Sequence, residues 1–251
     1  MIKFENVSFS YSGGRPVLDN VSFSINEGES VGLIGANGAG KSTLLKAALG
    51  LVQVEGTITV DGMILGRKTL ADVRKTLGYV LQDSDDQMFM PTVLDDMVFG
   101  PVNYGMGREE AEDLAENILS QLGVSYLMHR QNHKISGGEK RMAAIATVLM
   151  SSPKALLMDE PSSSLDPKNR RALIRTVNAL PVTKLIASHD LDMILETCSR
   201  VLLINSGWLA ADGPAEVVLR DRALLEGNEL ELPLSVAAVE KHPLAFPFKG
   251  V

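Results

Sequence analysis

A glycine-rich segment with a single lysine is the part of this sequence whose spacing most directly predicts chemistry. Residues Gly35–Ser42 read GANGAGKS, which fits the pattern G-x-x-x-x-G-K-[ST]. Glycines let successive main-chain N–H groups turn inward around phosphate oxygens, and the start of the following helix adds positive potential. Lys41 can reach the β- and γ-phosphates, and the Ser42 hydroxyl can bind Mg²⁺. The segment therefore predicts a site for a nucleoside triphosphate.

Two acidic residues at the end of an apolar run could complete such a site. Ala155–Met158 is apolar, and Asp159 and Glu160 follow it directly. Beside bound phosphates, we expect Asp159 to face Mg²⁺ through a water and Glu160 to be the general base for the attacking water. When two acids follow a strand without other signals, a helix cap or a solvated edge is the commoner explanation. Their pairing with the glycine-rich segment favours hydrolysis.

The elements that must position these residues can be predicted from hydrophobic periodicity. Ser30–Gly35 is a nearly continuous apolar run, which is typical of a buried central strand, and a helix is expected from about Ser42 to Leu51. Ile2–Phe9 and Val21–Ile25 alternate apolar and polar residues, which predicts half-buried antiparallel strands. From about Asp83 to Met150 the pattern is mostly helical.

Strand and helix alternate again in the second half of the chain. The expected elements are helices at Arg108–Leu122, Gly137–Met150 and Pro167–Leu180, strands at Ala155–Met158 and Lys184–Ala187, and a hairpin of Val201–Ile204 with Trp208–Ala211. One short helix is expected near Ser235 to Glu240, in a tail that contains Pro233, Pro243 and Pro247. The pattern predicts an α/β core with a helical insertion and an N-terminal antiparallel sheet.

Composition and charge limit the kind of core and the classes of partner that the sequence predicts. With 45% hydrophobic residues and few aromatic ones, the 251 residues predict a mainly aliphatic core. The net charge of −7 argues against a nucleic-acid partner. Cys198 is the only cysteine, so no intrachain disulfide can form, and we expect it to be buried. The N-terminus has no signal-peptide pattern, and Ala143–Met150 is too short to cross a bilayer, so we expect membrane involvement only through a partner.

A third motif narrows the class of nucleotide-binding protein. Ile135–Lys140 read ISGGEK and open a predicted helix shortly before the Asp159 strand. This motif resembles the signature sequence of ABC ATPases. The resemblance covers nearly the whole chain and implies a P-loop NTPase fold, an ABC cassette with a RecA-like core, an N-terminal antiparallel β subdomain and an inserted helical subdomain. We expect the ATPase domain over residues 1–220, its helical subdomain over about 83–150, and a C-terminal tail over 221–251.

The resemblance also implies roles for single residues. Tyr11 matches the aromatic residue that stacks on adenine, Gln82 the glutamine that binds Mg²⁺ and senses the partner, and His189 the switch histidine that contacts the γ-phosphate. Residues 163–166 match the loop that crosses the dimer interface. The residues expected to contact ATP are Tyr11, Gly35, Asn37, Gly38, Ala39, Gly40, Lys41, Ser42, Thr43, Gln82, Ser136, Gly137 and Gly138. The expected metal ligands are Ser42, Gln82 and Asp159, and the expected catalytic residues are Glu160, His189 and Lys41.

A second cassette is implied as well. The glycine-rich loop grips one side of the triphosphate, and the sequence offers no obvious arginine finger for the other. In the family, two cassettes pair head to tail, so that the helix start at Ser136–Gly138 of one closes on ATP held by the other. The pair can be two identical copies or two related chains. Two departures from the family pattern are Ile135 in place of leucine and Glu139 in place of the commoner glutamine.

Further segments point to a class of transporter. DDQMF at residues 85–89, DDMVFGP at 95–101 and the tail segment Leu230–Pro233 are similar to the ATPases of cobalt, nickel and energy-coupling-factor (ECF) vitamin importers. This implies an integral membrane subunit that docks near Gln82–Met90, and a peripheral location at the cytoplasmic face of the cell membrane. Two alternatives stay open at this point: a soluble ABC ATPase, or an ATP-gated dimerisation switch with low turnover and no tie to transport.

Overall fold

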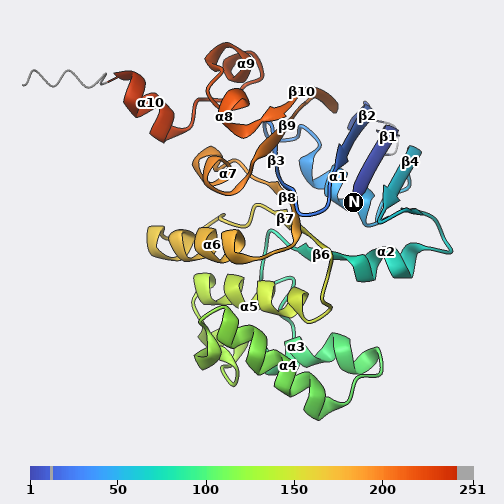
Figure 1. Ribbon diagram of the computed structural model, residues 1–251, viewed down its shortest axis with the longest axis vertical. Coiled ribbons are helices and arrows are strands. Elements are labelled where there is room, and N and C mark those ends of the chain that lie inside the picture. Colours follow the sequence, from blue (N-terminus) through green and yellow to red (C-terminus); the bar gives the residue numbers. More distant parts are fainter. Residues whose placement is uncertain (12–13, 242–251) are drawn as a thin grey trace, which may run out of the picture.

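A six-stranded sheet forms the centre of the molecule in the computed structural model, which describes residues 1–11 and 14–241 (Figure 1). The strands lie in the order β10-β9-β3-β8-β7-β6, and all are parallel except β10 at one edge. Their bounds are β3 (Ser30–Ile34), β6 (Leu77–Val80), β7 (Ala155–Asp159), β8 (Thr183–Ala187), β9 (Arg200–Asn205) and β10 (Trp208–Pro214). β7 and β8 are buried along their whole length, as the continuous apolar run of β7 predicts, and β8 buries Thr183 and Lys184 as well.

The antiparallel pairing of β9 and β10 confirms the hairpin predicted from the sequence. Ser206 and Gly207 connect the two strands with φ angles of 48° and 87°. Positive φ at both central residues is the conformation that lets a two-residue turn match the twist of the strands.

A second, antiparallel sheet covers one face of the first. Its order is β2-β1-β4-β5, with β1 (Ile2–Phe9), β2 (Leu18–Ile25), β4 (Glu55–Val60) and β5 (Met63–Ile64). Helix α1 (Lys41–Ala48) packs into the apolar core between the two sheets, where Leu44 and Leu45 are fully buried. The antiparallel sheet is therefore confirmed, although the sequence pattern predicted only β1 and β2 of it.

Three helices form a separate apolar core at one end of the molecule (Figure 1). They are α3 (Val93–Asn103), α4 (Arg108–Gln121) and α5 (Gly137–Leu149), and α4 and α5 lie where periodicity predicts helices. Met97, Leu119 and Ala143 are among the buried residues of this core. Two short 3-10 helices, Ser125–Leu127 and Asn132–Lys134, complete this part of the chain, whereas α2 (Leu70–Thr76) precedes β6 and buries Val73 in the core between the two sheets. The helical insertion is thus a bundle beside the sheet.

The remaining helices cover the other face of the central sheet. They are α6 (Pro167–Ala179), α7 (Leu191–Thr197), α8 (Ala215–Val218), α9 (Arg222–Gly227) and α10 (Leu234–Lys241). The tail holds two helices where one was expected, because Asp221 caps α9 and Leu225 anchors it in the core. Leu232 and Val236 are buried in the same core, so α10 packs against the helices that cover this face. Pro243, Pro247 and the rest of residues 242–251 lie outside the described residues.

Cys198 is buried, and burial raises the pKa of its thiol. In residues 1–11 and 14–241, none of the helices combines the length and the apolar character needed to span a bilayer.

Candidate active site

The loops that follow four parallel strands meet at one edge of the central sheet. Because the carboxyl ends of parallel strands lie on the same side of a sheet, the residues after β3, β6, β7 and β8 come together there. They surround a hollow of about 790 Å³. Its lining includes most of the residues singled out in the sequence, namely Tyr11, Asn37, Gly38, Ala39, Gly40, Lys41, Ser42, Thr43, Gln82, Glu160 and His189.

The glycine-rich loop needs glycine for steric reasons. Gly40, directly before α1, has a φ of 110°, and a Cβ atom there would lie 2.6 Å from the carbonyl oxygen of Val17. A residue with a side chain at this position would therefore have a strained backbone and would collide with the carbonyl group of Val17, directly before β2. The tight turn aims the start of α1 at the hollow, where unpaired main-chain N–H groups attract anions.

Lys41 extends back over this loop. Its Nζ donates a hydrogen bond of 2.7 Å to the carbonyl oxygen of Gly35 and lies 3.1 Å from Nε2 of His189. Burial lowers the pKa of Lys41, and the carboxylates of Glu160 and Asp159 oppose this shift. The ammonium group is thus held at the wall of the hollow, within reach of phosphate oxygens bound by the loop.

A carboxylate and a hydroxyl form a group of oxygen donors beside the loop. Ser42 Oγ donates a hydrogen bond of 3.1 Å to Oδ1 of Asp159. Because this proton points at the carboxylate, the lone pairs of Ser42 Oγ stay available to a cation. Gln82 lines the same neighbouring cleft as Ser42 and Asp159. Mg²⁺ prefers oxygen ligands and is often held by one or two carboxylates together with substrate phosphates, so the residues present fit this ion.

Tyr79 contacts this group and was not predicted from the sequence. Its hydroxyl donates a hydrogen bond of 3.2 Å to Oδ2 of Asp159. Burial and the neighbouring carboxylate raise the pKa of Tyr79, so the phenol keeps its proton. Nothing in the spacing along the chain links Tyr79 to Asp159, because the two lie on neighbouring strands far apart in sequence.

Glu160 has a backbone conformation that non-glycine residues seldom adopt. Its φ is 46°, and its N–H donates to the carbonyl oxygen of Ala187 at 2.8 Å. Oε2 accepts a hydrogen bond of 3.1 Å from the main-chain N–H of His189. Oε1 is buried, lies 3.4 Å from Nε2 of His189, and accepts no hydrogen bond from any described residue. A left-handed residue costs about 1–2 kcal/mol, and such strain is concentrated at functional sites.

An arginine that the sequence analysis did not single out also lines the hollow. Arg170 of α6 donates two hydrogen bonds to Asp190, from Nε at 2.5 Å and from Nη2 at 2.7 Å. Asp190 in turn caps α7 by accepting from the N–H of Met193. The guanidinium is therefore engaged in holding the residue after His189, and it fixes the start of α7 relative to α6.

The predicted adenine-binding residue lies at the rim of the hollow. Tyr11 is 50% exposed, and its ring packs edge-on against Phe9 with 4.8 Å between ring centroids. Its hydroxyl lies 3.5 Å from Oγ1 of Thr43. The half-exposed ring offers a surface on which a base could stack.

The signature residues are not brought into this hollow. Ser136 is the N-cap of α5, and Ser136 and Gly137 are exposed. Gly138 is buried against α6, since a Cβ atom there would lie 2.3 Å from Cγ of Asn169. Glu139 accepts hydrogen bonds of 2.8 Å from both the N–H and the Oγ of Ser136, which completes a capping box. These hydrogen bonds lower the pKa of Glu139.

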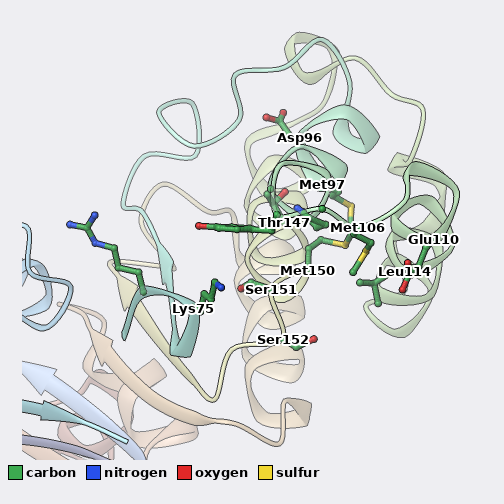
Figure 2. A pocket seen from close by; sticks show the side chains of 15 residues that line it. Lys75, Asp96, Met97, Met106, Glu110, Leu114, Thr147, Met150, Ser151 and Ser152 are labelled. Atoms are coloured by element: carbon green, nitrogen blue, oxygen red, sulfur yellow. The ribbon is translucent and has the colours of Figure 1, made fainter. Parts of the chain in front are cut away.

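The segment predicted to bind a membrane subunit carries exposed aromatic and acidic residues. Phe89 is 65% and Phe99 45% exposed, and their rings meet edge to face with 5.3 Å between centroids. Asp85 forms an ion pair with Lys140 of α5, and Asp86 is exposed. A hollow of about 570 Å³ lies in the same helical part, among α2, α3, α4 and α5 (Figure 2). Its apolar lining includes Met97, Pro101, Met106, Leu114 and Met150.

Comparison with known proteins agrees with this geometry. Residues 18–163, more than half of the chain, match the family described as ABC transporter. A putative ABC transporter ATP-binding protein of Gloeobacter violaceus is 44% identical over 235 residues, which cover 92% of this chain and 96% of the relative. The energy-coupling factor transporter ATP-binding protein EcfA of Methanothermobacter thermautotrophicus is 37% identical over 239 residues, or 93% of this chain and 77% of EcfA.

The same fold is present in a solved structure. CbiO1 of Clostridium perfringens, part of the ABC transporter complex CbiONQ, matches with a TM-score of 0.82 and 31% identity. The match covers 95% of this chain and 98% of CbiO1, which confirms the predicted cassette fold. By sequence, fold and similarity, the chain belongs to the ABC transporter ATP-binding proteins and is an ATPase.

Proposed function

We propose that this chain drives a membrane importer by hydrolysing ATP as one half of a head-to-tail pair of cassettes. One observation carries the proposal: Lys41, Glu160 and His189 line one hollow, whereas Ser136 and Gly137 are exposed outside it. The main-chain N–H groups and positive end of α5 are then available to a phosphate held by another molecule. A second cassette, either an identical copy or a related chain, would close the open side of the hollow.

ATP would bind with its adenine on Tyr11 and its phosphates in the turn that ends at Gly40. Lys41 would exchange its bond to the Gly35 carbonyl for bonds to β- and γ-phosphate oxygens, which are stronger because both partners are charged. Mg²⁺, held by Ser42, Gln82 and Asp159, would neutralise charge on the β- and γ-phosphates.

Hydrolysis would use the free oxygen of Glu160. A water bound to Oε1 would satisfy this buried acceptor and give up its proton to it while the water oxygen attacks the γ-phosphorus. The bond from the γ-phosphorus to the bridging oxygen breaks, and ADP leaves. The main-chain N–H of His189 donates a hydrogen bond to Oε2 of Glu160, and the side chain of His189 would contact the γ-phosphate. Lys41 and the start of α5 of the second cassette would stabilise the transferred charge.

The free energy that moves the membrane protein would come from the difference in stability between the ATP-bound and ADP-bound pairs of cassettes. Shifting a population from 1:99 to 99:1 requires about 5.5 kcal/mol of differential binding. ATP joins the two cassettes and its hydrolysis separates them, so the closing motion can be passed to an attached membrane protein.

The membrane partner would dock at the helical part, near Gln82–Met90. Support comes from the exposed Phe89 and Phe99, the neighbouring acidic residues, and the apolar hollow among α2–α5 (Figure 2). The sequence predicts an importer of cobalt, nickel or a vitamin. Two relatives support this class: EcfA, an energy-coupling factor transporter ATP-binding protein, and CbiO of Rhodobacter capsulatus, a cobalt import ATP-binding protein. The chain would then be peripheral, at the cytoplasmic face of the cell membrane.

Replacing the proposed base tests the reaction and its coupling to the pair. Glu160→Gln should form a stable dimer with ATP and should lose phosphate release by at least about 100-fold, the lower range for one general base. Sedimentation with ATP and a steady-state phosphate assay measure the two effects, and Glu216→Gln on the exposed face of α8 is the control. Normal phosphate release by Glu160→Gln would rule out the base, and slow release by the unaltered protein would favour a switch.

A further inference from the structure

Tyr79 connects the strand before Gln82 with the carboxylate proposed to face Mg²⁺. β6 and β7 pair in parallel, with Tyr79 opposite Leu157. From that register the phenol reaches along β7 to Asp159, which ends the strand, and its hydroxyl lies 3.2 Å from Oδ2. The contact therefore depends on strand order and register and not on a flexible loop.

The two oxygens of Asp159 are held by different partners. Ser42 donates to Oδ1 at 3.1 Å, and Tyr79 donates to Oδ2 at 3.2 Å. Asp159 is only 4% exposed, so water competes little for these oxygens. Hydrogen bonds on both oxygens set the plane of the carboxylate and prevent rotation about its last bond. Of the two donors, only Tyr79 lies outside the glycine-rich loop.

We propose that Tyr79 is a positioning residue that orients Asp159 for the nucleotide-bound Mg²⁺. The inference rests on the proposed function, in which Ser42 and Asp159 face the metal. Residues that hydrogen-bond to metal ligands orient them and tune their basicity, and loss of one such partner typically lowers metal affinity about 10- to 100-fold. Tyr79 itself would not touch the metal or the phosphates.

The substitution that tests this role changes a single atom. Tyr79→Phe removes the hydroxyl and keeps the ring, which packs at the edge of the core between the sheets. Oδ2 of Asp159 would lose its donor, while the loop, Lys41 and the adenine site would be unchanged. Nucleotide affinity without metal should therefore equal that of the unaltered chain. The additional affinity conferred by Mg²⁺ should fall.

Binding of a fluorescent ATP analogue to the full chain, first with EDTA and then in a Mg²⁺ titration, measures both quantities. We expect equal affinity in EDTA and a Mg²⁺ midpoint raised about 10-fold or more for Tyr79→Phe. Mn²⁺ in place of Mg²⁺ reports the metal directly, since its electron paramagnetic resonance signal changes on binding. Tyr104→Phe, the same change at a residue of the helical part that is 76% exposed, should leave the midpoint unaltered.

The outcomes separate this inference from the function on which it rests. Equal Mg²⁺ midpoints in the unaltered chain and Tyr79→Phe would overturn the positioning role and leave ATP binding intact. No Mg²⁺-dependent nucleotide binding by the unaltered chain would overturn both. Thermal unfolding checks the folding of Tyr79→Phe. If that variant were unfolded, Tyr79→Leu, which also lacks the hydroxyl and is apolar like the core it packs against, should show the same raised midpoint, and an unchanged midpoint there would also overturn the role.

Discussion

Arg141, on the helix that begins with the signature residues, donates a hydrogen bond to the main-chain carbonyl oxygen of Gln82 and another to that of Leu81. Arg141 is 4% exposed, so these carbonyl groups depend on it rather than on water. Gln87 adds a further link, from its Nε2 to the carbonyl oxygen of Ala144 at 2.7 Å. The segment after β6 and helix α5 are therefore joined by side chains of each that donate to main-chain carbonyl groups of the other.

Arg141→Met should lower the free energy of unfolding, because it removes the hydrogen bonds between α5 and the segment after β6. The variant keeps an unbranched side chain in the buried position and leaves two carbonyl groups without a partner, which should cost about 2–4 kcal/mol of unfolding free energy. Urea denaturation measures the change. Arg175→Met, at an exposed position of α6, is the control and should stay within about 0.5 kcal/mol of the unaltered chain. A similarly small effect of Arg141→Met would show that the two carbonyl groups find other partners.

Much of the active site could be predicted because it is encoded in short contiguous runs. The apolar run of β3 and the glycine-rich loop predict α1 and the place of Lys41, and the run of β7 predicts Asp159 and Glu160 at a strand end. The hairpin across Ser206 and Gly207 is likewise local. In each case neighbouring residues determine the geometry.

What could not be predicted depends on pairing between distant elements. Tyr79 and Asp159 are 80 residues apart, and Arg141 and Gln82 are 59 apart. Their contacts follow from β6 lying beside β7 and from α5 packing under the segment after β6, and no local pattern encodes either arrangement. Arg170 was missed for the same reason, since its partner Asp190 lies 20 residues away.

The docking proposal can be tested at Asp86 more cleanly than at Asp85. Both acids lie in the segment expected to bind the membrane subunit, but Asp85 also pairs with Lys140 of α5, so reversing its charge would disturb the signature helix. Asp86→Lys should reduce recovery of the intact complex about 10-fold or more, because like-charge contacts at an interface cost several kcal/mol. Affinity capture with co-expressed membrane subunits measures recovery. Asp19→Lys, on β2, is the control, and equal recovery of both variants would place docking elsewhere.

The carboxylate of Glu139 should restrain ATP-driven pairing. It accepts from both the N–H and the hydroxyl of Ser136, which are donors that a phosphate of the second cassette would need. Glu139→Gln keeps the capping box, since glutamine also serves in that position, but it removes the negative charge. Dimerisation with ATP in the Glu160→Gln background should therefore tighten, by about 10-fold if the repulsion relieved is about 1.4 kcal/mol.

Sedimentation at graded ATP concentrations measures this change. Glu109→Gln removes the same charge from the first turn of α4 and is the matched control. High salt should reduce the difference in dimerisation between Glu139→Gln and the Glu160→Gln parent, because salt screens exposed charges. If Glu139→Gln and its parent dimerise equally at low salt, Glu139 does not face a phosphate.

Asp190 should contribute a pH-dependent part of the stability. Burial raises the pKa of Asp190, but hydrogen bonds from Arg170 and from the N–H of Met193 outweigh it, so the pKa in the folded chain is below its ordinary value. A carboxyl group with a lowered folded pKa stabilises the fold above its unfolded pKa of about 3.9 and loses that contribution as pH falls through the folded value. Asp190→Asn retains a capping oxygen for α7 but loses the ion pair with Arg170.

The variant should be about 1.5–3 kcal/mol less stable than the unaltered chain near pH 7, which is the range for hydrogen bonds to charged groups. Below about pH 4 the difference should shrink, because the unaltered chain then loses the charged pair as well. Urea denaturation from pH 7 to pH 3 follows the difference, and Asp113→Asn, on the exposed face of α4, reports the effect of net charge alone. A difference that stays constant down to pH 3 would mean that Arg170 holds Asp190 through geometry that protonation does not disturb.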